Sequence, residues 1–305
     1  MVRGCAVVGV ALLLGGCSIR GMAVKALGRA LAESGDVFSS DEDPELVAGA
    51  LPFALKTIEA LLAEAPRDRN LLLAACSGFT QYAYGFVEVE AFLLEVEDYR
   101  RSRELDRRAL KLYLRSRDYC LRGLEIRHDG AGERLRVEPE AVAAELGKEE
   151  IGFIAWAGAA WGSAISLALD QPAIAADVPA VRALLDRAAA LDADYGDGLV
   201  HSALISLDAL PEAMGGSVAR ARAHFDRVVE LTGGASASPY VSLAVGVTVP
   251  AQDSAEFRRL LEQALAVDPD AVPRLRLENV IAQRRARVLL DRIEDYFLEV
   301  EPPAE

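Results

Sequence analysis

Apolar residues recur every three or four positions along most of this chain, and short polar connectors separate the runs. That spacing is typical of amphipathic α-helices, and it extends from about residue 44 to residue 298. Asp43-Pro44-Glu45 marks a helix start, because proline suits the first helical turn and acidic side chains favour the helix N-terminus. A second helix is expected from Asp68, and the short connector makes the two helices antiparallel neighbours. We therefore predict an all-α chain.

A repeat underlies the helical pattern. Several helices share an apolar triplet with spacings of four and then three residues, and each helix ends soon afterwards at a loop. The triplets are Ala54, Ile58 and Leu61; Val181, Leu185 and Ala188; Ala221, Phe225 and Val228; and Phe257, Leu261 and Ala264. This pattern resembles the second helix of a tetratricopeptide repeat (TPR). Stacked helix pairs of this kind bury each other's apolar faces. The predicted fold is a TPR-like superhelix of antiparallel helix pairs, an α-solenoid with a concave surface.

The N-terminus has the features of an export signal. Arg3 precedes an apolar run from residue 5 to residue 14, which is too short to span a bilayer but has the length of a signal-peptide core. Leu14-Gly15-Gly16-Cys17 resembles the lipobox of bacterial lipoproteins, in which Cys17 would be lipidated and become the mature N-terminus. An ordinary signal peptide with a chance cysteine is the alternative.

The chain divides accordingly into a lipoprotein signal peptide (1–16), a lipidated N-terminus with its linker (17–43), a helical domain (44–298) and a tail (299–305). We expect it in the periplasm, attached to a membrane through its lipid anchor only. Ser18 after the lipidated cysteine favours the outer over the inner membrane by the enterobacterial sorting rule.

The balance of charged residues limits the classes of molecule that the chain is expected to bind. The chain has 33 Lys and Arg against 47 Asp and Glu, a net charge of −14, which repels a phosphate backbone and argues against nucleic-acid binding.

Cys76 and Cys120 remain after processing and could pair in an oxidising envelope. Both lie in helical apolar patterns, and we favour the alternative that they are two unpaired, buried thiols.

Catalytic and metal-binding patterns are missing from the sequence. It has no CxxC motif, no HExxH motif, no phosphate-binding loop and no nucleophile elbow, and its histidines (His128, His201 and His224) are far apart. We therefore expect a protein that is not an enzyme, with no cofactor and no metal.

Several segments resemble the TatT-type lipoproteins associated with TRAP (tripartite ATP-independent periplasmic) transporters, in order and over about residues 44–297. The matching segments are 72–84, 155–162, 191–198, 215–225, 249–253 and 279–287. The resemblance implies a periplasmic lipoprotein with a TPR-like fold that forms homotrimers and associates with the solute-binding subunit of a TRAP transporter. It also implies a hydrophobic pore or cavity that holds or passes a ligand, and it implies no catalytic residues.

Candidate ligand- or partner-binding residues lie in three of these segments. They are Phe79, Gln81, Tyr82, Tyr84, Trp156, Trp161, Asn279, Gln283, Arg284 and Arg287. For the aromatic residues, packing in the core is the alternative role. Asn279 and Gln283 share a helix face and are expected to contact a ligand or to clamp a loop. Arg284 and Arg287 could bind a carboxylate, unless they form a surface network of ion pairs with Glu278, Asp291 and Glu294.

The sequence thus predicts a non-catalytic accessory of a TRAP transporter that docks the solute-binding subunit and holds a small hydrophobic or organic-acid ligand. A general TPR scaffold lipoprotein for cell-envelope assembly is the alternative, and its partners would not be transporter subunits.

Overall fold

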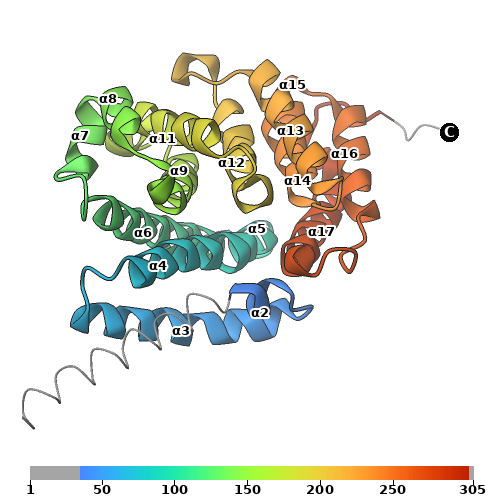
Figure 1. The fold of residues 1–305 in the computed structure, drawn as a ribbon. Helices are drawn as coiled ribbons and strands as arrows, with labels where there is room; N and C mark the ends of the chain where they lie inside the picture. The colour runs from blue at the N-terminus through green and yellow to red at the C-terminus, as the bar shows by residue number, and fades with distance from the viewer. Residues whose placement is uncertain (1–34, 302–305) are drawn as a thin grey trace, which may run out of the picture.

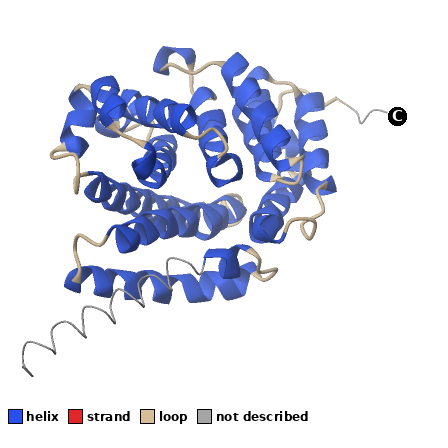
Figure 2. Cartoon of the chain, in the orientation of Figure 1, coloured by secondary structure: helices blue, strands red, loops and turns tan. Residues whose placement is uncertain are grey.

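The computed structural model describes residues 35–301, and all regular structure in this part of the chain is helical (Figure 2). The all-α prediction is confirmed. The longer helices are α3 (Pro44–Glu64), α4 (Arg69–Tyr82), α6 (Tyr99–Leu124), α9 (Ile151–Ser166), α11 (Val178–Leu191), α12 (Leu199–Asp208), α13 (Val218–Thr232), α16 (Ser254–Ala266) and α17 (Arg276–Asp291). The shorter ones are α2 (Gly35–Ser39), α5 (Val89–Leu94), α7 (Ala131–Val137), α8 (Pro139–Glu145), α10 (Pro172–Ala175), α14 (Ser238–Leu243), α15 (Val249–Ala251) and α18 (Ile293–Tyr296).

Each long helix packs against the next long helix along the chain, beginning with α3 on α4 and ending with α16 on α17, except that the short helix α14 lies between α13 and α16 and contacts both. Figure 1 shows that this succession curves round instead of running straight, so that the red C-terminal helices approach the blue N-terminal ones. Contacts of α17 with α2, α3 and α5 close the curve. The two ends of the helical array therefore support each other.

Aspartate side chains fix several helix starts. Asp43 Oδ1 accepts a hydrogen bond from Leu46 N at 2.9 Å at the start of α3, as the Asp43-Pro44 pattern predicts. Asp98 accepts from Arg101 N at 2.9 Å at the start of α6. Such caps satisfy backbone N–H groups that have no partner within the helix. Helix starts are consequently the best-specified points of the fold.

The apolar core forms two clusters that meet at α12. The larger one joins α3, α4, α6, α9 and α11, and the smaller one joins α13, α14, α16 and α17. The predicted triplets contribute to both clusters: Ile58, Leu185 and Leu261 are all buried. Gly158 permits the close approach of α9 to α11, because a Cβ atom there would lie 2.6 Å from Leu185 Cγ.

Cys76 of α4 and Cys120 of α6 are joined by a disulfide, with their Cα atoms 5.3 Å apart. The interpretation as two unpaired thiols is therefore wrong, although both residues are completely buried as expected. The apolar stripe of each helix faces the other helix, and the two sulfurs meet where the stripes cross. A buried position in two packed helices is compatible with either state, so the helical pattern alone could not distinguish them.

Two segments widen into π-helices, η1 (Ala83–Glu88) after α4 and η5 (Ala244–Thr248) after α14. π-Helical turns are rare in proteins, and those that occur often lie at functional sites. The helix near the C-terminus is also interrupted: α17 ends at Asp291, where Arg292 leaves helical geometry (φ −111°, ψ 23°). The Arg292 side chain donates to Leu93 O at 3.2 Å, which ties this break to α5.

We expect removal of the disulfide to destabilise the protein. A Cys76→Ala, Cys120→Ala double variant frees a loop in the unfolded chain and is expected to lose roughly 2–4 kcal/mol in the free energy of unfolding, measured by urea titration. Thiol titration of the unfolded wild-type protein should reveal two additional thiols only after reduction. Equal thiol counts before and after reduction would contradict the pairing.

Candidate functional site: a recess between the two halves

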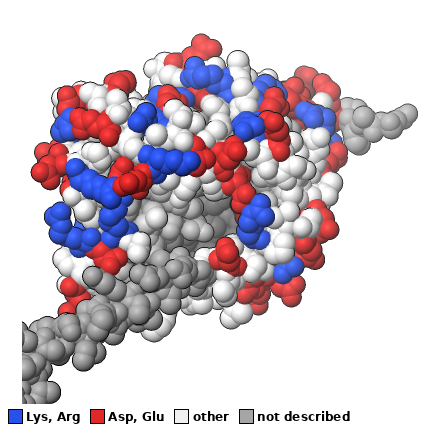
Figure 3. Space-filling view, viewed as in Figure 1, with Lys and Arg blue, Asp and Glu red and all other residues white. Residues whose placement is uncertain are grey.

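The molecule is hollowed near the middle of the face shown in Figure 3. In the same orientation, α9 and α12 lie on one side of this hollow, α4 and α5 lie on the other, and α14 and α17 lie at its end (Figure 1). We call the space between these helices the central recess. Helices of both core clusters border it.

A chain of hydroxyl and carboxyl groups joins the two halves. Tyr84 of η1 lies with its hydroxyl 3.4 Å from Ser238 Oγ at the start of α14. Ser238 is hydrogen-bonded in turn to Glu278 of α17. Ser236 Oγ donates to Glu278 Oε1 at 3.2 Å. The π-helix η1 therefore contributes directly to this end of the recess.

Glu278 lies in the first turn of α17, and its side chain is exposed to solvent. Desolvation by the surrounding protein raises the pKa of its carboxyl above the ordinary value, while the hydroxyls of Ser236 and Ser238 act in the opposite direction. The N-terminus of a helix favours a negative charge at this position.

Aromatic and apolar side chains pack together where α4, α9 and η3 (Tyr195–Gly198) meet. Trp156 of α9 is half-buried and is hydrogen-bonded to the hydroxyl of Tyr195 in η3. A Cβ atom at Gly152 would lie 3.0 Å from both Leu73 Cδ2 and the Tyr195 hydroxyl, which shows how closely α4, α9 and η3 meet.

Asp197 connects η3 to Arg274, in the turn that precedes α17. It has a left-handed backbone conformation (φ 54°), which is unfavourable for a residue other than glycine. Two hydrogen bonds from Arg274, 2.6 Å and 2.8 Å long, hold its carboxylate. Hydrogen bonding to Arg274 lowers the pKa of Asp197, so the pair is charged at neutral pH. Asp197 also acts electrostatically on Glu278, which places η3 close to that carboxylate.

Glu88, at the C-terminal end of η1, is the second carboxylate with a raised pKa. Burial is the main cause, opposed by Arg285 of α17 and by a hydrogen bond from Tyr113. The Tyr113 hydroxyl donates to Glu88 Oε2 at 2.5 Å and is also hydrogen-bonded to Ser163 of α9. Unlike Glu278, this carboxylate has a nearby cation.

The predicted residues Asn279 and Gln283 hold loops in place. Asn279 is completely buried, accepts from Ala237 N and donates to Ala235 O, both at 2.8 Å. Gln283 Nε2 lies within hydrogen-bond distance of three carbonyl oxygens at the end of α16, at 2.7 Å from that of Val267. Asn279 thus positions the loop that carries Ser236 and Ser238.

Among the predicted aromatic residues, the structure separates core positions from recess positions. Trp161 is completely buried and donates from Nε1 to Asp177 Oδ2 at 3.1 Å. Phe79 is buried and stacks on Tyr119 with ring centroids 5.8 Å apart. Tyr82 is buried and accepts a hydrogen bond from Arg108. Of this set, Trp156 and Tyr84 are only partly buried.

The remaining predicted polar residues have other surroundings. Gln81 is exposed and donates back to Ser77 O of its own helix at 3.3 Å. Arg284 forms an ion pair with Glu45 of α3 at 2.7 Å, in place of the expected network with Glu278, Asp291 and Glu294. Hydrogen bonding to Arg284 lowers the pKa of Glu45. Arg287 is exposed.

Sequence reasoning missed the residues that link the recess walls. Glu278 was named only as a member of an alternative surface ion-pair network, whereas Tyr195, Asp197 and Ser236 fell in connectors, Ser238 fell at a helix start, and all four received no role. The matching segment 191–198 contained a signal, because it holds both Tyr195 and Asp197 in a glycine-rich turn. No pattern in the sequence indicated that this turn lies beside residue 278.

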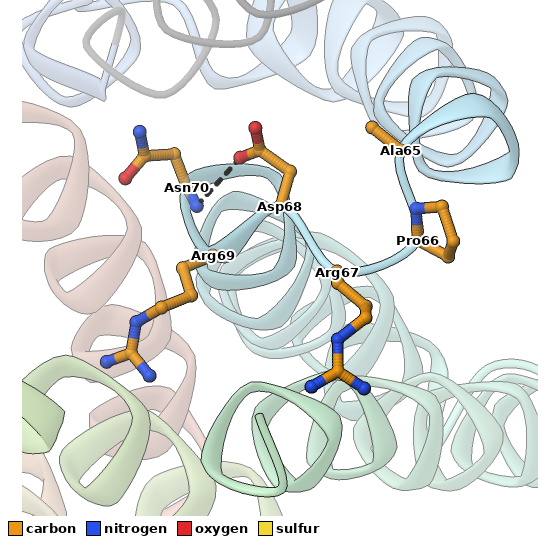
Figure 4. Close-up of a pocket in the computed structure, with 6 residues that line it drawn as sticks. All are labelled: Ala65, Pro66, Arg67, Asp68, Arg69 and Asn70. Atoms are coloured by element: carbon orange, nitrogen blue, oxygen red, sulfur yellow. Dashed lines mark hydrogen bonds between the residues drawn. The ribbon is translucent and has the colours of Figure 1, made fainter. Parts of the chain in front are cut away.

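A shallower depression lies at the α3–α4 connection (Figure 4). Its lining residues already have structural roles. Asp68 caps α4 by accepting from Asn70 N at 3.0 Å. Arg69 donates to Gly123 O at 3.2 Å and to Glu149 O at 3.0 Å, which ties the start of α4 to neighbouring segments. We therefore assign the ligand site to the central recess.

A buried histidine pair lies between α12 and α13. The Nδ1 atoms of His201 and His224 are 2.9 Å apart, so one ring donates and the other accepts. His224 Nε2 lies 3.5 Å from Asp208 Oδ2. Asp208 is buried and accepts from Arg182 (2.6 Å) and Arg220 (2.9 Å). Burial lowers the pKa of both histidines. Both rings are therefore neutral at pH 7.

Comparison with known proteins places this geometry in context. Residues 40–297 match the family model described as the TRAP transporter T-component. An uncharacterised protein of Treponema pallidum (strain Nichols) is 30% identical over 309 aligned positions, covering 94% of this chain and 95% of that protein. The match spans both halves of the helical array and therefore includes the whole central recess.

The histidine pair predicts a loss of stability in mild acid. Because both pKa values are lower in the folded than in the unfolded protein, the stabilising contribution is complete above about pH 6.5 and declines as the pH falls below it. We expect the melting temperature to fall between pH 7.5 and pH 5 in the wild type and to fall less in a His201→Gln, His224→Gln variant. Parallel pH profiles of the two proteins, measured by differential scanning calorimetry, would contradict the assignment.

Proposed function

The chain belongs to the TRAP transporter T-component family, and we propose that it acts as a lipid-anchored periplasmic accessory that docks the solute-binding subunit of such a transporter and holds a small ligand. The family is one of transporter accessories, not of enzymes. The observation that supports the ligand role is the hollow near the middle of one face, which helices of both core clusters border. Concave sites between helices are typical places for small molecules to bind.

The outer side of α3 supports assembly with other chains. Leu46 and Phe53 keep 61% and 79% of their surface exposed, and Ala50 between them is also exposed. Gly49 has no atom within 4 Å of the position of an added Cβ, so packing within the described chain does not require a glycine there. We call these four residues the α3 face, and we assign it to contacts between copies in a homotrimer.

Of the helices that the structure describes, α3 alone is long and apolar enough by length and composition to cross a membrane. Its inner side packs into the protein, with Leu55, Ile58 and Leu62 buried in the larger core cluster. An amphipathic membrane-surface helix would carry basic residues along its polar face. α3 carries one, Lys56, together with Glu45, Glu59 and Glu64. This composition supports a protein contact over a lipid contact.

We expect the purified chain to bind the solute-binding subunit of a TRAP transporter encoded in the same genome. Analytical ultracentrifugation at tens of micromolar should show one complex containing both proteins. Absence of a complex at that concentration would contradict the docking role. Enrichment of outer-membrane assembly proteins instead, after affinity purification, would favour the general scaffold function.

A pair of variants separates assembly from docking. Phe53→Asp places a charge on the α3 face and is expected to convert the trimer to monomers without unfolding the chain, because the side chain is 79% exposed. Val137→Asp is the matched control, since Val137 is 84% exposed on α7, away from the α3 face. A Phe53→Asp protein that remains trimeric would exclude this face as the contact.

The lipid anchor has a direct test, although Cys17 and the signal peptide lie outside the described residues. Cys17→Ser removes the thiol that would carry the lipid and is expected to move the protein from the membrane fraction to the soluble periplasmic fraction. Cys5→Ser is the control, because processing would remove Cys5 with the signal peptide. Unchanged fractionation of the Cys17→Ser protein would refute the lipoprotein prediction.

A further inference from the structure

We propose that the exposed side of α6 is the surface that docks the solute-binding subunit, and that a row of three arginines on it binds carboxylates of the subunit. The three are Arg108, Arg115 and Arg122, and we call them the arginine row. This inference rests on the docking part of the proposed function and specifies the face that docks and the chemistry of the contact.

The exposed side of α6 has the opposite charge to the chain as a whole. The chain has a net charge of −14. The inner side of α6, with Leu105 and Tyr113, is buried, and α4 and α9 pack on the helix (Figure 1). The exposed charged residues of α6 are Arg100, Arg101, Arg103, Arg107, Arg108, Lys111, Arg115 and Arg122 against Glu104 and Asp118. An acidic partner would therefore be repelled by most of the molecule and attracted to this helix.

The acidic residues of α6 do not neutralise the arginine row. Each is paired with an arginine outside the row: Glu104 with Arg101, Asp106 with Arg103 and Asp118 with Arg117. Arg115 is paired with Glu59 of α3, whose side chain is only 9% exposed. No ion pair of residues 35–301 includes Arg108 or Arg122. These two guanidinium groups consequently keep their charge available to a partner.

Aromatic rings hold the arginine row in position. The distances from guanidinium carbon to ring centroid are 5.7 Å for Arg108 on Tyr82, 4.8 Å for Arg115 on Phe79 and 5.2 Å for Arg122 on Tyr119. Arg108 also donates to the Tyr82 hydroxyl at 3.1 Å, and Arg122 donates to Pro66 O at 3.3 Å. Each guanidinium has five N–H groups, so several remain for a two-pronged contact with a carboxylate. Because these side chains are already ordered, binding a partner costs less conformational entropy.

The arrangement of the row favours a protein partner over a membrane. Its members are seven residues apart, which is two helical turns and about 10 Å along the axis. Regularly spaced, immobilised guanidinium groups match carboxylates on an ordered surface, whereas attraction to anionic lipid requires no fixed geometry. A helix that lies on a membrane also inserts apolar side chains. In α6, Tyr99 at the first position is the only exposed large apolar residue.

A charge reversal tests the assignment. An Arg108→Glu, Arg122→Glu variant of the mature full-length protein is expected to bind the solute-binding subunit about tenfold or more weakly than the wild type in surface plasmon resonance. Both side chains are exposed, so the fold should be retained, which circular dichroism checks. Arg115 is left in place because Glu59 depends on it. Equal affinities of the variant and the wild type would overturn the proposal.

A second double variant controls for the total charge. Lys148→Glu, Arg287→Glu makes the same change in net charge at exposed positions outside α6, and it should bind the subunit as the wild type does. Raising NaCl from about 50 mM to about 500 mM is expected to weaken wild-type binding about tenfold and to change binding of the α6 variant much less. Equal weakening by the two double variants, or wild-type binding that salt does not alter, would contradict a specific contact at α6.

Two further measurements test other occupants of this face. The α6 variant alone should sediment as the same oligomer as the wild type, and dissociation would assign the face to contacts between copies instead. Unlipidated Cys17→Ser protein should not bind phosphatidylglycerol vesicles, and binding that the α6 reversal abolishes would assign the face to the membrane. If the wild type does not bind the subunit at all, the docking role fails and this inference with it. If it binds and the α6 variant binds equally, only the assignment to α6 fails.

Discussion

The structure depends on the need of each helix to cover an apolar side that it cannot bury alone. α4 is the clearest case, because Leu71, Leu72, Ala75, Cys76 and Phe79 are buried against α3 and α6 on its two sides. A straight array of such helices would leave its first and last members half-covered. Here the array curves until α17 reaches α3 and α5, so the end helices gain a second neighbour. The curvature that completes this packing also encloses the recess.

The closure of the helical array on itself explains why the polar links between its two halves are few and specific. The Tyr84–Ser238 contact, the Arg274–Asp197 pair and the Arg284–Glu45 pair each join segments more than 70 residues apart in the chain. The exposed pairs among them contribute little to stability individually. These links instead fix the position of one half of the helical array relative to the other. Strain at Asp197, with its positive φ, persists because Arg274 holds its carboxylate with two bonds.

Local rules account for the part of the fold that sequence could predict. The Asp43-Pro44 cap and the buried triplet positions Ile58, Leu185 and Leu261 follow from helix chemistry within single segments. The Cys76–Cys120 disulfide did not follow, because it depends on where two stripes cross. The π-helix at Ala83–Glu88 was equally invisible, since a local pattern of apolar residues does not distinguish one extra residue in a turn.

The candidate site shows even more clearly that patterns within one segment cannot predict contacts between distant segments. On a helical wheel, Glu278 is a polar residue near arginines, and a surface ion pair is the natural interpretation. Its environment is set instead by Ser236 and Ser238, which Asn279 holds through the loop at 235–237, and by Asp197 from a different repeat. Glu278 lies in the first turn of α17, where the helix N-terminus favours an acidic side chain. The presence of an acid there therefore follows from a local rule, whereas its serine partners follow from tertiary packing that no local rule contains.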